Sequence, residues 1–171
     1  MDTNTIMMII FPLTSLIFGL VGGLITAKQI PNWYQKLIKP SFNPPNWIFG
    51  PAWTTLYIMI GISGYLVWKE KQSFSPEHSL AWTIYFAQLV FNYAWTPLFF
   101  YFHMLFVALI EIVIMDVLIW INIVLFYSIN PTAGLLLIPY GCWVTFATCL
   151  NYSIWSLNKN NAEMEAKLAQ N

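Results

Sequence analysis

Five long runs of apolar residues, separated by short polar segments, dominate the pattern along the chain. They cover about residues 6–27, 47–68, 80–102, 104–128 and 133–157, and a helix needs roughly 20 apolar residues to cross a bilayer. The last segment, 158–171, is polar and has Glu163 and Lys167 at a helical spacing. The pattern predicts one all-α integral membrane domain, residues 1–171. We expect a bundle of five transmembrane helices whose polar tail prolongs the fifth helix or frays.

Composition supports this class of protein. Of the 171 residues, 58% are apolar and 8% are charged, whereas an average soluble domain carries about 25% charged residues. The formal net charge is zero, so nothing points to nucleic acid as a partner. The lipid bilayer is therefore the first partner that the sequence predicts.

The distribution of lysines predicts an orientation in that bilayer. Five spans put the two termini on opposite faces. The face with the long loop after the first run and the C-terminus carries five lysines: Lys28, Lys36, Lys39, Lys159 and Lys167. The other face has Lys69 and Lys71. Because cytoplasmic loops are enriched in basic residues, we expect the long loop and the C-terminus in the cytoplasm and the N-terminus outside.

Small residues and a proline predict close contacts and a break. Gly19, Gly22 and Gly23 form a thin patch on which another helix can pack closely. Pro97 is expected to break the third helix. Thr83 and Ala87 are spaced as a small-xxx-small pair, which predicts a homodimer packed through the third helix. Packing of this pair inside the same bundle stays open as the alternative.

The stretch from Trp33 to Trp53 links the first two apolar runs and is rich in rings and prolines. Four prolines restrict its backbone, so we expect a stiff loop close to polyproline II. Such a loop is suited to closing over a flat, apolar molecule. An aromatic belt at the membrane interface is the alternative interpretation.

Six amide or carboxyl side chains lie within the apolar runs: Gln88, Asn92, Glu111, Asp116, Asn122 and Asn151. Polar groups in spans usually face the bundle interior. Glu111 and Asp116 are five residues apart and point about 140° away from each other, so they are not a matched acid–base pair. We expect Glu111 to reach the surface and Asp116 to be protonated or hydrogen-bonded. A proton relay and simple contact between helices both remain open.

Two helices carry stripes that are compatible with a ligand site. Asn92 and Trp95 share a face of the third helix. The fifth helix has a stripe at the same kind of spacing: Trp143, Ala147, Leu150 and Asn151. The small Ala147 leaves a notch beside the Trp143 ring, and Trp53 lies near the same end. A slot lined by indoles suits a planar polycycle, although core packing would give a similar stripe.

Metal ligation and disulfide formation have little support. His78 and His103 lie at the ends of spans, where neither is placed as an axial haem ligand. Cys142 and Cys149 are seven residues apart, about 10 Å along one helix, and cannot pair. We interpret both cysteines as small core residues. No catalytic residue and no metal site are predicted.

Several motifs occur together in a characteristic order. They are Trp33-Tyr34, Lys39-Pro40-Ser41-Phe42-Asn43-Pro44-Pro45, Trp47-Ile48-Phe49-Gly50-Pro51-Ala52-Trp53, Tyr65-Leu66-Val67-Trp68-Lys69-Glu70, Asn92-Tyr93-Ala94-Trp95-Thr96-Pro97 and Phe146-Ala147-Thr148-Cys149-Leu150-Asn151-Tyr152. Over roughly residues 33–155 the chain resembles the translocator protein family, also called the tryptophan-rich sensory protein (TspO) or peripheral benzodiazepine receptor family. The resemblance implies a pocket inside a five-helix bundle, capped by the long loop.

The resemblance also implies a function. Family members bind porphyrins, sterols such as cholesterol, and benzodiazepine-type drugs, which predicts a membrane receptor or sensor in tetrapyrrole handling and stress response. A porphyrin would be a ligand held by stacking rather than a metal-ligated cofactor. The candidate ligand-binding residues are Tyr34, Pro44, Phe49, Trp53, Asn92, Trp95, Trp143, Ala147, Leu150 and Asn151. Light-dependent degradation of protoporphyrin, using Trp53 and Trp143, and transport of porphyrins or sterols are the alternatives.

The sterol-binding pattern of the family is incomplete. Six residues separate Tyr152 from Lys159, one more than the proposed pattern allows, and Ser156 stands where animal proteins carry arginine. This departure argues against cholesterol as the ligand. It fits a bacterial member in the inner membrane, with the mitochondrial outer membrane as the expected location if the source is eukaryotic.

Overall fold

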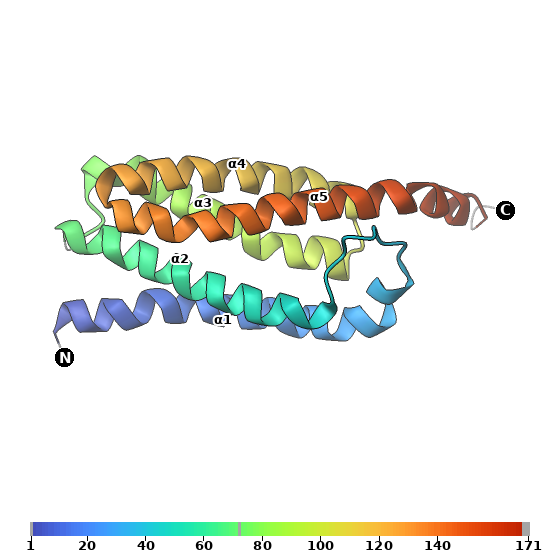
Figure 1. Ribbon diagram of the computed structural model, residues 1–171, viewed down its shortest axis with the longest axis horizontal. Coiled ribbons are helices and arrows are strands. Elements are labelled where there is room, and N and C mark those ends of the chain that lie inside the picture. The colour runs from blue at the N-terminus through green and yellow to red at the C-terminus, as the bar shows by residue number, and fades with distance from the viewer. Residues whose placement is uncertain (1, 72, 169–171) are drawn as a thin grey trace.

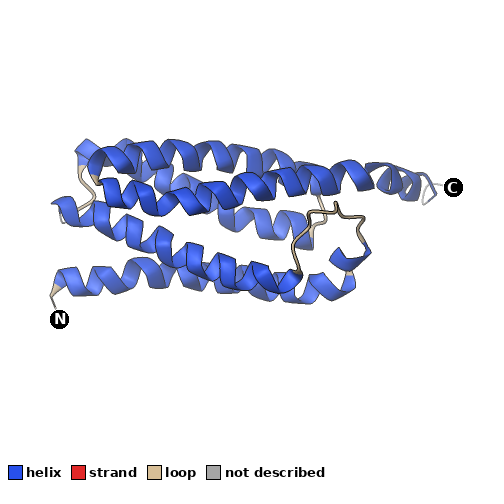
Figure 2. Cartoon of the chain, viewed as in Figure 1, coloured by secondary structure: helices blue, strands red, loops and turns tan. Residues whose placement is uncertain are grey.

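Five long helices form an elongated antiparallel bundle in the computed structural model, which describes residues 2–71 and 73–168 (Figure 1). They are α1 (Thr3–Asn32), α2 (Phe49–Lys71), α3 (Ser79–Thr96), α4 (Leu105–Ile129) and α5 (Pro131–Leu168). Helices and loops account for the whole of the described chain (Figure 2). The N-terminus lies at one end of the bundle, and the C-terminus lies at the other end, beside the loop that joins α1 to α2.

The third predicted helix, 80–102, is divided into two kinds of helix. α3 ends at Thr96, and a π-helical segment, η4 (Pro97–Tyr101), follows it. Pro97 lacks the N–H that an α-helix needs, and the Phe102 N–H donates to the Pro97 carbonyl at 2.9 Å, five residues back. His103 then adopts a positive φ of 56° and reverses the chain into α4.

The first and fifth helices are longer than the apolar runs predict. α1 continues to Asn32, five residues beyond the predicted end, and contains Pro31. α5 begins at Pro131, since proline suits the first turn and the Asn130 side chain caps the helix by accepting from the Ala133 N–H at 3.1 Å. α5 runs to Leu168, so residues 158–168 prolong the helix, which is the first of the two alternatives for the tail.

Glycines set the closest approach of α2 to α1. A Cβ on Gly61 would lie 2.6 Å from the Pro12 nitrogen, so the two backbones pack directly together there. Of the predicted glycine patch, Gly19 faces the Tyr57 ring with no room for a side chain, which confirms that part of the prediction. Gly23 has nothing within 4 Å of its Cβ position, so for Gly23 the prediction of close packing is wrong.

Polar residues in the helices lie mostly inside the bundle. Gln88, Asn92, Asn122 and Asn151 are all buried, as expected. Glu111 is buried as well, although it was expected to reach the surface, because its helix turns this position toward the core rather than outward. The half-buried Asp116 accepts a hydrogen bond from Thr145 at 2.9 Å, which agrees with the second expectation.

The two cysteines are not core residues. Cys142 and Cys149 are both free and exposed, which contradicts the interpretation drawn from their size. They lie on the outer face of α5, where an apolar residue needs no core partner if the surroundings are lipid. By length and composition, three of the described helical segments are apolar enough to cross a membrane: Thr3–Asn32, Leu105–Ile129 and Pro131–Asn160.

Candidate ligand pocket

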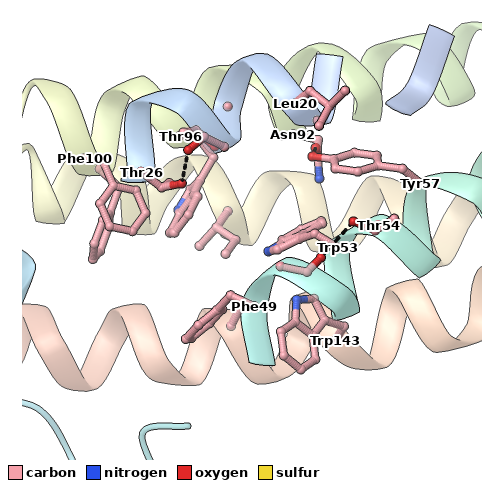
Figure 3. A pocket seen from close by; sticks show the side chains of 18 of the residues that line it. Leu20, Thr26, Phe49, Trp53, Thr54, Tyr57, Asn92, Thr96, Phe100 and Trp143 are labelled. Carbon is pink, nitrogen blue, oxygen red and sulfur yellow. Dashed lines mark hydrogen bonds between the residues drawn. The ribbon is translucent and has the colours of Figure 1, made fainter. Parts of the chain in front are cut away.

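A cavity of about 540 Å³ lies between the helices and extends to Tyr34 and Asn46 in the loop between α1 and α2. Figure 3 shows many of the side chains in its wall. All five helices contribute to its wall. Its aromatic lining consists of Tyr34, Phe49, Trp53, Tyr57, Trp95, Phe99, Phe100 and Trp143. The wall is therefore mostly ring faces and ring edges, interrupted by a few amide and hydroxyl groups.

The structure brings almost all the sequence-predicted candidates together. Nine of the ten candidates line the cavity: Tyr34, Phe49, Trp53, Asn92, Trp95, Trp143, Ala147, Leu150 and Asn151. Pro44 is not part of the wall. It lies in the loop, where its carbonyl accepts a hydrogen bond from the Asn43 side chain at 3.1 Å.

Contacts between neighbouring rings fix the orientation of the three tryptophans. Trp53 stacks on Tyr57 with 5.5 Å between ring centroids. Trp95 stacks on Phe99 at 4.8 Å, and Trp143 meets Phe49 edge to face at 6.0 Å. Offset-stacked and edge-to-face pairs are the preferred geometries of aromatic rings, so these rings hold one another in place.

A chain of hydrogen bonds closes one side of the cavity. The Tyr57 hydroxyl donates to Asn92 Oδ1 at 2.7 Å, and Asn92 Nδ2 donates to the Tyr140 hydroxyl at 3.0 Å. Tyr140 in turn donates to Gln88 Oε1 at 2.8 Å. All four side chains are buried, so the chain joins α2, α3 and α5 where an unpaired polar group would be costly.

A second amide holds Trp95. The Trp95 indole N–H donates to Asn151 Oδ1 at 3.1 Å, and Asn151 Nδ2 donates to the Leu105 carbonyl at 3.1 Å. Asn151 is itself 1% exposed. Its part in the site is therefore to orient the Trp95 ring and to tie α5 to the start of α4.

The connector, residues 33–48, folds back over the end of the cavity. It is not extended throughout, because short 3₁₀ turns, η1 (Tyr34–Lys36) and η2 (Asn46–Ile48), interrupt it. Tyr34 is buried and donates its hydroxyl proton to Asn43 Oδ1 at 2.8 Å, while Lys39 Nζ lies 4.7 Å from its ring centroid. Burial raises the pKa of Tyr34 to about 12, so the hydroxyl stays protonated. Trp33 stacks on His103 at 4.0 Å and fixes the start of the connector.

Sequence reasoning missed the wall that α1 contributes. Leu20, Gly23 and Thr26 line the cavity from this helix, together with further aliphatic residues (Figure 3). α1 has no aromatic–amide stripe to reveal this. The glycine patch was the available signal, because Gly19, Gly22 and Gly23 all line the cavity. Leu20 on α1 and Thr54 on α2 are both exposed and both line the cavity, so the cavity reaches the outer surface of the bundle at these two helices.

Charged and metal-ligating groups are scarce around the cavity. Within residues 2–71 and 73–168, no group of three or more His, Cys, Asp and Glu is placed to hold a metal ion. The buried Glu111 carboxyl has no hydrogen-bond partner for either oxygen among the described residues. The cavity thus offers stacking and hydrogen bonding, which are the means of binding a flat, apolar molecule.

These features define a class of protein: a helical bundle with a tryptophan-lined cavity between its helices and a folded connector over one end of that cavity. The model of the TspO/MBR family matches residues 9–156, and the chain belongs to this family. It is 38% identical over 155 residues to the tryptophan-rich protein TspO of Archaeoglobus fulgidus, covering 91% of this chain and 99% of that protein. The translocator protein of Homo sapiens is 38% identical over 81% of this chain and 82% of its own length. Protein CrtK of Rhodobacter capsulatus is 40% identical over 82% and 85%.

The buried hydrogen-bond chain gives the first prediction. Tyr140→Phe removes one hydroxyl and leaves both Asn92 and Gln88 with an unsatisfied buried amide group. We expect a loss of about 1–3 kcal/mol of unfolding free energy, measured as thermal unfolding in detergent. Tyr152→Phe is the matched control, because Tyr152 is 55% exposed. Equal effects of the two changes would contradict a structural role for the hydrogen bonds between Tyr57, Asn92, Tyr140 and Gln88.

Proposed function

We propose that this protein crosses the membrane five times and binds porphyrins and related flat, apolar molecules in the cavity between its helices. It acts as a receptor or sensor in tetrapyrrole handling and stress response. The observation that carries the proposal is the set of ordered rings around a volume of about 540 Å³. That volume falls within the roughly 300–1,000 Å³ of small-molecule sites.

The wall matches the chemistry of such a ligand. Flat conjugated rings stack well on indole and phenyl groups, which Trp53 and Trp143 supply from α2 and α5. Asn92 and Thr96 supply polar points for the ligand's substituents. A porphyrin would be held as a ligand by stacking and hydrogen bonds, and benzodiazepine-type drugs would use the same wall. The exposed Tyr152 lies outside it, in keeping with the incomplete sterol pattern.

The tryptophans provide the test of the site. Trp143→Ala and Trp53→Ala should each weaken protoporphyrin binding by about 1–3 kcal/mol, by analogy with the stacking of bases on aromatic side chains. Fluorescence-quenching titration of the purified protein in the dark measures the affinity. Trp47→Ala is the control, since Trp47 is 73% exposed and lies outside the cavity wall. Wild-type affinity in both folded cavity variants would refute the assignment.

The same titration under illumination separates binding from degradation. With a receptor or sensor, light causes no more loss of porphyrin absorbance than it causes in the protein-free control. Loss of the porphyrin spectrum in the wild type, but not in Trp143→Ala, would favour the light-dependent enzyme.

The outer surface of the bundle supports insertion in the bilayer. Large apolar side chains are exposed along several helices, among them Leu20, Leu24, Val90 and Val124 at 66–69%. Such a surface is stable in lipid and would be an aggregation hazard in water. The connector and the C-terminus share one end of the bundle, as five spans require (Figure 1). The excess of lysines at that end supports a cytoplasmic connector and C-terminus, and an N-terminus outside.

Accessible-cysteine labelling tests this orientation. In a background without Cys142 and Cys149, we expect Lys36→Cys to react from the cytoplasmic side and Ser73→Cys from the opposite side. Both positions are exposed at opposite ends of the bundle, so the reagent can reach them. The reverse pattern would show that the lysine bias does not set the topology.

Assembly as a homodimer through α3 completes the proposal. Thr83 is exposed and Ala87 is half-buried, on a helix face that also exposes Leu80 and Val90. Changing Thr83 and Ala87 together to Leu should shift the detergent-solubilised protein toward monomer, as measured by light scattering, without loss of porphyrin binding. A variant that stays dimeric places the interface elsewhere. A variant that also loses binding assigns the pair to the bundle core.

A further inference from the structure

Asn158 pairs with the backbone of the connector across 120 residues of sequence. Asn158 Oδ1 accepts from the Ile38 N–H at 3.0 Å, and Asn158 Nδ2 donates to the Ile38 carbonyl at 2.9 Å. The same Nδ2 donates to the Ile154 carbonyl at 2.7 Å, one turn back on α5. One side chain therefore binds both the backbone N–H and the backbone C=O of Ile38, much as a neighbouring strand would.

The amide at position 158 is used in a single orientation. Its two N–H groups point at two carbonyls, and its oxygen points at one N–H. Exchange of the oxygen and nitrogen would set the amide oxygen against the carbonyl oxygens of Ile38 and Ile154, and the NH2 group against the Ile38 N–H. Asn158 is 7% exposed, so water does not readily replace these bonds. An aspartate here would place an oxygen against both carbonyls and could not substitute for the amide.

The connector needs such a partner at this point. After η1 the backbone becomes extended, with Leu37 at φ −69° and ψ 143°, and Pro40 keeps Lys39 out of the helical region. The Ile38 peptide therefore has no helical partner of its own. Its side chain is 49% exposed, so the connector is held at Ile38 through the backbone more than through packing of this residue.

The paired segments adjoin the cavity on both sides. Tyr34, four residues before Ile38, lines the cavity, and so does Ile154, four residues before Asn158. Both belong to one buried cluster together with Leu150. A bond between Ile38 and Asn158 consequently fixes the distance between the capping phenol and the α5 wall.

We propose that Asn158 is a positioning residue of the ligand site. By holding the Ile38 peptide, it keeps the connector closed over the cavity and slows the departure of a bound porphyrin. The inference rests on the proposed function, since it requires a ligand in the cavity. Asn158 lies two residues beyond the segment that the family model matches, so the match assigns nothing to it.

Dissociation kinetics test the role of Asn158. Asn158→Ala should raise the dissociation rate of protoporphyrin roughly tenfold, as expected from the loss of the two hydrogen bonds to Ile38, with a smaller effect on the association rate. Hydrogen–deuterium exchange at the Ile38 amide should accelerate in the ligand-free variant as well. Asn160→Ala is the control, because Asn160 is exposed two residues further along α5. It should change neither rate.

A second variant acts from the connector. Ile38→Pro removes the N–H that donates to Asn158 and leaves α5 unchanged, so it should also speed dissociation. This variant keeps the inference testable if Asn158→Ala fails to fold. Faster exchange and faster release together support the inference. Wild-type release from either folded variant overturns it, and means that the ligand leaves by another route, such as the place where the cavity reaches the outer surface at α1 and α2. Failure of the wild type to bind protoporphyrin would instead overturn the proposed function, and the inference with it.

Discussion

Buried amide side chains are the constraint on which the cavity depends. Asn92 joins Tyr57 to Tyr140, Asn151 fixes the Trp95 indole, and in both cases the amide has a partner on each side. Away from water, an amide that loses a partner pays its full desolvation cost, so these bonds favour one arrangement of the helices strongly. Aromatic packing alone would tolerate several arrangements, since rings can slide over one another. The amides therefore give the wall its defined shape.

The glycine and proline positions complement the amides. Gly61 brings α2 against Pro12 of α1. Further along α1, nothing lies within 4 Å of the Cβ position of Gly23, which lines the cavity. Pro97 converts the end of α3 into a π-helical segment, which places Phe99 and Phe100 toward the cavity. Local backbone features thus decide where the bundle is tight and where it is hollow.

Periodicity in the sequence was enough to predict the five helices and the stripe on α5, because apolar length and helical spacing act locally. It predicted the cavity side of Trp95 and Trp143 for the same reason. The wall from α1 could not be predicted, since a uniformly apolar helix has no face that differs in composition. Burial of Glu111, exposure of Cys142 and the pairing of Asn158 with Ile38 depend on how distant segments meet, which no local pattern records.

The fifth helix combines two tasks that proteins often divide between elements. Trp143, Ala147 and Leu150 form part of the cavity wall, and Asn158, further along the same helix, is hydrogen-bonded to the backbone of the connector. A small rotation of α5 about its own axis would therefore change the shape of the cavity and, at the same time, weaken the hydrogen bonds that join α5 to the connector. Because one helix carries both features, a change in the shape of the cavity and a displacement of the C-terminal end of α5 would be coupled through a single rigid element.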